Sequence, residues 1–280
     1  MQNVVIRFPK AVAPPLGGQL IVWLGLVLGT TTAGLLWGFR LAVLTTIVLT
    51  VLAILLQRRY YRLPPPKRDR TPLHPLAAFR TMTPKLKRFL LADCLIRFGN
   101  RMFLAFVVLY VMNVMKRGAD EFGWLQGLLM LTSVTMYIPA AKLSDRSGPW
   151  GRRPFVAATF TFFTLFPLAL VWAPSPAWLI PAFIIGGLRE FGEPARKALI
   201  IDLIPSARRG QQMGTYYMVR GAFTLAAPFL GGLLWTTASP RTPFVVGGLI
   251  TGLGLVWFLA ESTFFRDDVP SAPAEPENPE

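Results

Sequence analysis

Charged side chains recur inside stretches of the sequence that are otherwise apolar. Asp93, Arg97, Asn100 and Arg101 stand at successive spacings of four, three and one within residues 89–112. Spacings of three and four put side chains on one face of an α-helix. A stripe that carries both signs of charge can form ion pairs, bind an anion or hold a proton.

Two later apolar stretches carry charges of the same kind. Residues 177–201 contain Arg189, Glu190 and Glu193, followed by Arg196 and Lys197, and residues 213–236 contain Arg220 one turn after Tyr216 and Tyr217. A charge in the hydrocarbon layer costs at least about 2.5 kcal/mol on insertion scales, so it needs a partner or water. When the depth of each charged residue in the membrane is counted at about 1.5 Å per helical residue, these groups form a layer near the membrane midplane.

Two interpretations of this layer remain open. In the first, the charges only pair with one another, for example Asp93 with Arg97 and Arg189 with Glu193. In the second, the four arginines of the layer exceed its three acids, which suits an anionic solute. Because burial disfavours the charged form of a carboxyl group, Glu190 or Glu193 could also bind and release a proton.

The composition indicates that these charges lie in a membrane protein. The chain has 280 residues, of which 53% are hydrophobic, and a formal net charge of +15. Its mean hydropathy is +0.47. Apolar runs of spanning length with basic connectors explain both values, whereas a nucleic-acid binder would be basic without such runs. One cysteine, Cys94, and one histidine, His74, predict no disulfide, no metal site and no cofactor.

A membrane span needs about 20 apolar residues, and eight stretches meet this length approximately. The first two are predicted to meet at Gly38, Phe39 and Arg40. We therefore expect an all-α, polytopic helical bundle with spans near 16–37, 40–57, 89–112, 122–142, 154–173, 177–201, 213–236 and 243–261.

The longest connector, residues 58–88, holds ten Lys and Arg but one acid. Positive residues stay on the cytoplasmic side, so this stretch is predicted to be a cytoplasmic linker with one surface helix. When the remaining loops are placed alternately on the two sides of the membrane, residues 262–280 fall on the cytoplasmic side. These residues are acidic and Pro-rich, so they are predicted to form a disordered tail. The expected location is the plasma membrane, the bacterial inner membrane.

A short element occurs twice in the sequence. Ala-Pro-Pro-Leu-Gly-Gly at residues 13–18 recurs as Ala-Pro-Phe-Leu-Gly-Gly at residues 227–232. Proline bends a helix and paired glycines admit a close neighbour. The matching topological positions favour an ancestral repeat over chance and predict helix kinks at Pro14, Gly17, Gly18, Pro228, Gly231 and Gly232.

Three motifs in order resemble the major facilitator superfamily. The first is the Asp-Arg loop that runs from Leu143 to Arg153, the second is the stretch from Gly192 to Pro205 followed by Arg208–Gly210, and the third is the element at residues 227–232. The resemblance covers residues 89–261, a complete six-helix half. Residues 1–57 resemble the last two helices of an amino-terminal half, so the resemblance implies that the first four helices of the family pattern are not part of this sequence.

The resemblance implies a secondary transporter that moves a small solute by alternating access, with proton coupling and efflux both open. It also implies that the loop gates the cytoplasmic side, with Arg146, Arg152 or Arg153 pairing with Asp202. The insertion of Pro149, Trp150 and Gly151 departs from the family pattern. The expected gate residues are Asp145, Arg146, Gly148, Arg152, Arg153 and Asp202, with Asp145 accepting from the start of the seventh span.

Two rival interpretations assign the chain to other classes of membrane protein. A truncated fragment or subunit would need a missing four-helix partner before it could enclose a path. A membrane-embedded enzyme is disfavoured, because the sequence has no Ser/His/Asp set, metal-ligand cluster or phosphate-binding Gly loop. We therefore expect no enzyme activity.

Overall fold

The structure is a computed structural model that describes residues 15–19, 23, 32–60, 75–146, 148–205 and 208–264. Within these ranges the regular elements are all helical. The predicted all-α membrane bundle is confirmed. Residues 61–74, nearly half of the predicted linker, and residues 265–280, most of the predicted tail, lie outside the description.

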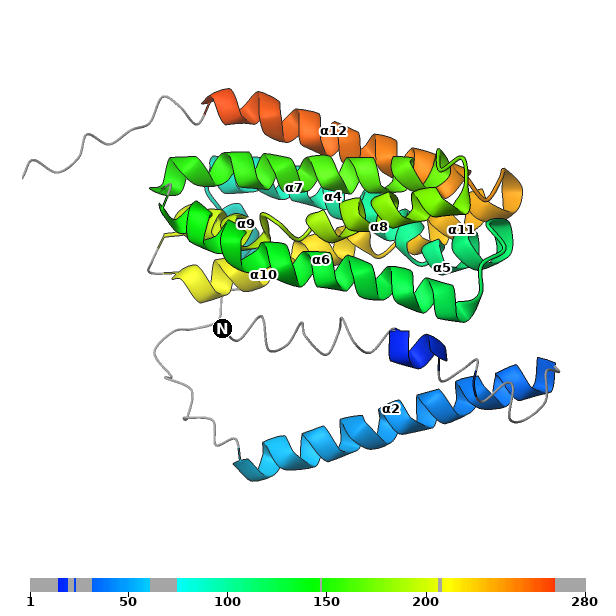
Figure 1. The fold of residues 1–280 in the computed structure, drawn as a ribbon. Coiled ribbons are helices and arrows are strands. Elements are labelled where there is room, and N and C mark those ends of the chain that lie inside the picture. Colours follow the sequence, from blue (N-terminus) through cyan, green and yellow to red (C-terminus); the bar gives the residue numbers. More distant parts are fainter. Residues whose placement is uncertain are drawn as a thin grey trace, which may run out of the picture.

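The helices from α4 onward form one elongated bundle (Figure 1). Its first half comprises α4(Pro84–Leu104), α5(Val107–Leu109), a π-helical turn η1(Tyr110–Val114), α6(Ala119–Arg146) and α7(Gly148–Val171). Its second half comprises η2(Pro176–Trp178), α8(Leu179–Leu188), α9(Glu193–Asp202), α10(Arg209–Thr224), α11(Ala227–Thr237) and α12(Thr242–Phe264). A short helix α3(Pro75–Arg80) precedes α4 and takes the place of the predicted surface helix.

Helix α2(Thr32–Tyr60) runs beside the bundle as a separate rod (Figure 1). It passes through Gly38, Phe39 and Arg40 without a turn, so the predicted boundary between the first two spans is wrong. Leucine, valine and isoleucine continue on both sides of these residues, and an uninterrupted apolar helix satisfies its own backbone in lipid. The part of the predicted first span before Thr32 lies outside the described residues except for residues 16–19 and 23.

Five helical stretches are long and apolar enough to cross a membrane by length and composition: Phe39–Tyr60, Pro84–Val114, Gly151–Val171, Arg209–Thr237 and Thr242–Glu261. Helix α6 is also long, with 28 residues, but Gln126 and Ser133 lower the hydropathy of one of its faces. The predicted span 177–201 is divided into η2, α8 and α9. The lower hydropathy of α6 and the division of the span 177–201 both differ from the prediction, and both occur where polar residues line the interior.

Helix α4 packs against α10, α11 and α12, and α7 packs against α8, α9 and α12. The crossing of α4 and α12 depends on small residues. A Cβ atom added to Gly99 would lie 2.4 Å from the carbonyl oxygen of Gly247. Because the two backbones nearly touch, α4 is held firmly and can present its charged stripe at a defined position.

The predicted span 177–201 is broken between Leu188 and Glu193. Gly192 lies directly against α7, where an added Cβ would be 2.0 Å from the carbonyl oxygen of Phe155. Its amide donates to Thr159 Oγ1 at 2.6 Å, and Pro194 restarts the helix in the first turn of α9. Residues 189–192 therefore cross the interior as irregular backbone, which membranes tolerate only inside protein or beside a cavity.

The connection between α6 and α7 is shorter than predicted. Helix α6 continues to Arg146 and α7 begins at Gly148. The inserted Pro149, Trp150 and Gly151 form the first turn of α7, where proline costs no intrahelical hydrogen bond. The insertion thus lengthens a helix instead of enlarging a loop.

The two copies of the repeated element have different surroundings. In α11 an added Cβ at Gly231 would lie 1.9 Å from the carbonyl oxygen of Met102, whereas one at Gly232 would meet only Phe106 Cζ at 3.6 Å. In the first copy, Gly18 approaches the carbonyl oxygen of Ala119, and an added Cβ at Gly17 would find nothing within 4 Å. Pro14 lies outside the described residues.

Candidate functional site

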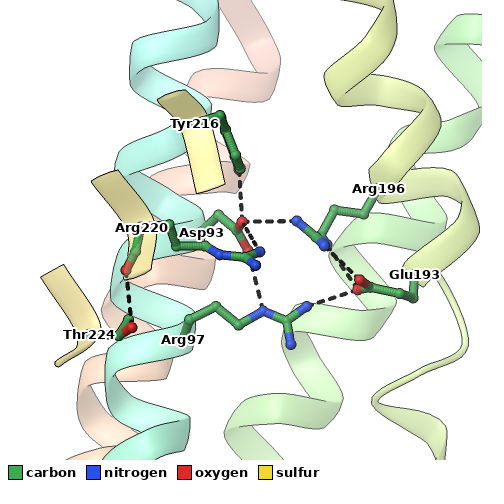
Figure 2. A network of polar contacts seen from close by, with 7 residues as sticks. All are labelled: Asp93, Arg97, Glu193, Arg196, Tyr216, Arg220 and Thr224. Atoms are coloured by element: carbon green, nitrogen blue, oxygen red, sulfur yellow. Dashed lines mark hydrogen bonds and ion pairs between the residues drawn. The ribbon is translucent and has the colours of Figure 1, made fainter. Parts of the chain in front are cut away.

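A buried carboxylate organises the polar interior of the bundle (Figure 2). Asp93 on α4 is 0% exposed. Its Oδ2 accepts hydrogen bonds from Arg196 Nη1 at 2.9 Å, Tyr216 Oη at 2.7 Å and Arg220 Nη1 at 3.0 Å. Asp93 Oδ1 forms an ion pair with Arg97 Nε at 3.6 Å. One carboxylate thus joins α4, α9 and α10.

Glu193 lies in the first turn of α9 and forms the second acidic centre. Its Oε1 accepts from Arg196 Nη2 at 2.5 Å, and its Oε2 accepts from Arg196 Nε at 2.9 Å and from Arg97 Nη2 at 2.8 Å. The spacing of three between Glu193 and Arg196 lets the Nε–Nη2 edge of the guanidinium meet both carboxylate oxygens. We call Asp93, Glu193, Arg196 and Tyr216 the carboxylate hub.

Arg189 is held in a separate position from the hub. Its Nε donates to the carbonyl oxygen of Gly186 at 2.8 Å and its Nη1 to Asn100 Oδ1 at 2.6 Å. The guanidinium carbon lies 4.1 Å from the ring centroid of Phe166. The suggested pair between Arg189 and Glu193 is therefore not the one that forms, because the break before α9 directs Arg189 toward Asn100 on α4.

A cavity of about 580 Å³ opens beside the hub. Helix α6 contributes only uncharged side chains, Gln126, Leu129, Met130 and Ser133. The other lining residues come from α4, α7, α8, the break before α9, α9 and α10; they are Arg97, Asn100, Arg101, Leu104, Phe163, Gly186, Arg189, Glu190, Lys197, Arg220 and Thr224.

The charge of the cavity lining is strongly unbalanced. Among the lining residues, five are basic and one, Glu190, is acidic. We call the five the cationic wall; they are Arg97, Arg101, Arg189, Lys197 and Arg220. Arg97 and Arg220 reach the cavity while also binding the hub, and Arg220 lies over the ring of Tyr217 at 4.6 Å.

The structure brings together all eight residues predicted for the solute or proton path. Seven of them line the cavity or the hub through the contacts above, and Arg101 lies exposed at the cavity wall. The predicted pair of Asp93 and Arg97 forms. Sequence reasoning noted Arg196 and Tyr216 but did not place them in the site. The spacing of three from Glu193 is the signal for Arg196, and the spacing of four from Arg220 is the signal for Tyr216.

The predicted gate region has one described ion pair between helices. Arg152 at the start of α7 binds Asp202 at the end of α9 through its Nη1. Arg146 is exposed, and Arg153 has an interaction of its own. Gly148 begins α7, but the side chain of Asp145 lies outside the description, so its predicted contact does too.

These features define a multi-pass integral membrane protein with a charged internal cavity. The family model described as Major Facilitator Superfamily matches residues 89–280. The chain belongs to the major facilitator superfamily, a family of membrane transporters.

Curated relatives include transporters from fungi and bacteria. The MFS-type transporter ucsD of Acremonium sp is 31% identical over 140 residues, which are 50% of this chain and 23% of that protein. The uncharacterized MFS-type transporter YitZ of Bacillus subtilis is 26% identical over 146 residues, 49% of this chain and 82% of that protein. The multi-drug resistance efflux pump PmrA of Streptococcus pneumoniae is 26% identical over 155 residues, 54% of this chain and 37% of that protein. The chain thus spans well under half the length of ucsD and PmrA.

Proposed function

We propose that this chain is a secondary active transporter that moves a small anionic solute by alternating access, with the cavity as the solute site. The observation that carries the proposal is the cavity lining, with five basic residues against one acidic residue. Transporter sites commonly lie near the midplane beside broken helices, and the break at residues 189–192 borders this cavity. Efflux is the proposed direction, since the similar PmrA is named an efflux pump.

Alternating access requires contacts that form on one side and open on the other. We assign such a contact to Arg152 and Asp202, which join the ends of α7 and α9. Their side chains are 18% and 35% exposed, so water can replace the pair when the helices separate. Arg146, Arg153 and Asp145 belong to the same proposed gate, on the side that the basic connectors assign to the cytoplasm.

Proton coupling is assigned to Glu190 in preference to Glu193. Both oxygens of Glu193 accept from arginines, so releasing them for protonation would break several charge-assisted hydrogen bonds. Glu190 is the acidic residue in the cavity lining. Protonation there would increase the positive charge of the cavity and favour anion binding.

Reconstitution tests the function directly. Purified chain in proteoliposomes should move labelled organic anions, and a pH gradient should change the rate. Glu190→Gln should abolish the response to the gradient while leaving exchange without a gradient. Absence of flux for every anion in both conditions would refute the transporter, and an unchanged gradient response in Glu190→Gln would refute the proton assignment.

A second candidate function is a subunit that acts only with a further helical partner. Helix α2 favours it, because the span Phe39–Tyr60 has no buried residue in its apolar window. An apolar rod of this kind faces either lipid or another protein. Light scattering of the detergent-purified chain gives its oligomeric state, and flux in vesicles gives its activity. A monomer that catalyses flux would eliminate the subunit function.

A further inference from the structure

We propose that the cavity selects an amphiphilic organic anion, with Arg189 as its preorganised anchor and α6 as the surface for its apolar part. This inference rests on the proposed function for the passage of the solute, but the binding step can be measured without transport. It names the chemical class of the ligand and the residue that determines specificity.

Arg189 is constrained on three sides before any ligand arrives. Two of its nitrogens donate to Gly186 and Asn100, and its guanidinium lies over the rings of Phe166 and Phe163, at 4.1 and 5.4 Å. Among the described residues, Nη2 has no acceptor within hydrogen-bonding distance. Because the planar group has lost its rotational freedom, a ligand that accepts from Nη2 pays little further ordering entropy.

The rest of the cationic wall supplies unsatisfied positive charge. Arg101 and Lys197 form no ion pair within the described part of the chain. Arg97 and Arg220, by contrast, bind the hub at 2.8 and 3.0 Å. An acid group between Arg189 and Arg101 would therefore gain charge-assisted hydrogen bonds without displacing the carboxylates of the hub.

The α6 side of the cavity requires a different ligand part. Leu129 and Met130 lie between Gln126 and Ser133 on one face of α6, and Leu104 lines the cavity from α4. An inorganic anion would leave this apolar surface wet. A volume of about 580 Å³ is within the range of roughly 300–1,000 Å³ that accommodates drug-sized ligands. The two surfaces together fit an acid group attached to an apolar body.

Equilibrium dialysis of the full chain in detergent tests this class with three labelled probes: naphthoate, its neutral analogue naphthamide, and acetate. Naphthoate carries both features, naphthamide lacks the charge and acetate lacks the apolar body. We expect naphthoate to bind at least about tenfold more tightly than either analogue. Equal affinity for naphthamide, or for acetate, would overturn the proposal.

Variants locate the probe in the cavity. Arg189→Gln should weaken naphthoate binding at least about tenfold, and Arg189→Lys should recover only part of it because the fork geometry is lost. Arg88→Gln is the matched control, since Arg88 lies on α4 but pairs with Glu261. If Arg189→Gln does not fold by size-exclusion chromatography, Arg101→Gln replaces it with the same expectation. Unchanged affinity in folded Arg189→Gln would refute the anchor, and unchanged affinity in Arg101→Gln would refute the placement of the acid group between Arg189 and Arg101.

A bilayer lipid with an anionic headgroup has related chemistry, so phosphatidylglycerol serves as a competitor. Failure of phosphatidylglycerol to displace naphthoate supports a free solute. Complete displacement at equal concentration would overturn the solute assignment. Naphthoate binding without flux in vesicles would leave this inference intact and refute only the transport function.

Discussion

The carboxylate hub and the cationic wall lie side by side, and both are made largely of arginines, but their environments differ. In the hub the Arg196 side chain is 1% exposed and is shared by two carboxylates. In the wall the side chains of Arg97 and Arg220 are 18% and 20% exposed, and they also face the cavity. Access to the cavity therefore separates a structural arginine from one that can meet a ligand, because Arg97 pairs with both Asp93 and Glu193 just as Arg196 does.

Arg97 and Arg220 connect the two regions. Each donates to a hub carboxylate while lining the cavity. An anion that competes for these arginines would loosen links from α4 to α9 and α10. The comparison therefore predicts that hub variants lose the fold, whereas wall variants lose binding.

The largest effect is expected for Asp93→Asn. Without the charge, buried Arg196 loses one of its two carboxylates, and breaking a buried pair from one side costs about 3–5 kcal/mol. The free energy of unfolding in mixed micelles measures this loss. Glu121→Gln serves as a control, since Glu121 pairs with Arg117 at the surface. A loss below about 1 kcal/mol in Asp93→Asn would remove the distinction between hub and surface.

Next in size is the substitution of neighbouring glycines in α11. Gly231→Ala should destabilise the protein by about 1–3 kcal/mol, because the added methyl would overlap the backbone of α4. Gly232→Ala should be neutral or stabilising, since only an aromatic side chain lies at van der Waals distance. Thermal unfolding of the two variants compares them. Equal midpoints would show that the close approach of α4 and α11 does not contribute to the stability of the bundle.

For the wall, Arg101→Gln should separate binding from stability. We expect naphthoate affinity to fall about tenfold while the free energy of unfolding changes by less than about 0.5 kcal/mol. Dialysis and denaturant titration on the same preparation provide both values. A variant that loses stability but keeps its naphthoate affinity would show that Arg101, like Arg196, has a structural role.

The smallest effect is expected for the pair of Arg152 and Asp202. A double-mutant cycle with Arg152→Gln and Asp202→Asn should give a coupling energy of about 0.2–1 kcal/mol, because both side chains are partly solvated. High salt should reduce this value. Coupling as strong as that of the hub would be incompatible with a contact that opens during each transport cycle.

Much of this protein follows from the sequence alone. Apolar runs of spanning length predict helices in lipid, since no other single-chain element satisfies its backbone there except a closed barrel. Spacings of three and four predict the stripe of Asp93, Arg97, Asn100 and Arg101, and the motif order predicts the family. These properties are local or compositional, so neighbours in space are not needed to recognise them.

The tertiary structure decided which charges meet. Arg189 turns to Asn100 instead of Glu193, and Arg196 and Tyr216 complete the hub, because the break at residues 189–192 and the glycine contacts of α4 set the relative depth and rotation of three helices. The sequence also predicted a turn at residues 38–40 that α2 does not make. A linear pattern specifies which side chains share one helix face, whereas ion-pair partners depend on helix crossings made by residues far apart in the chain.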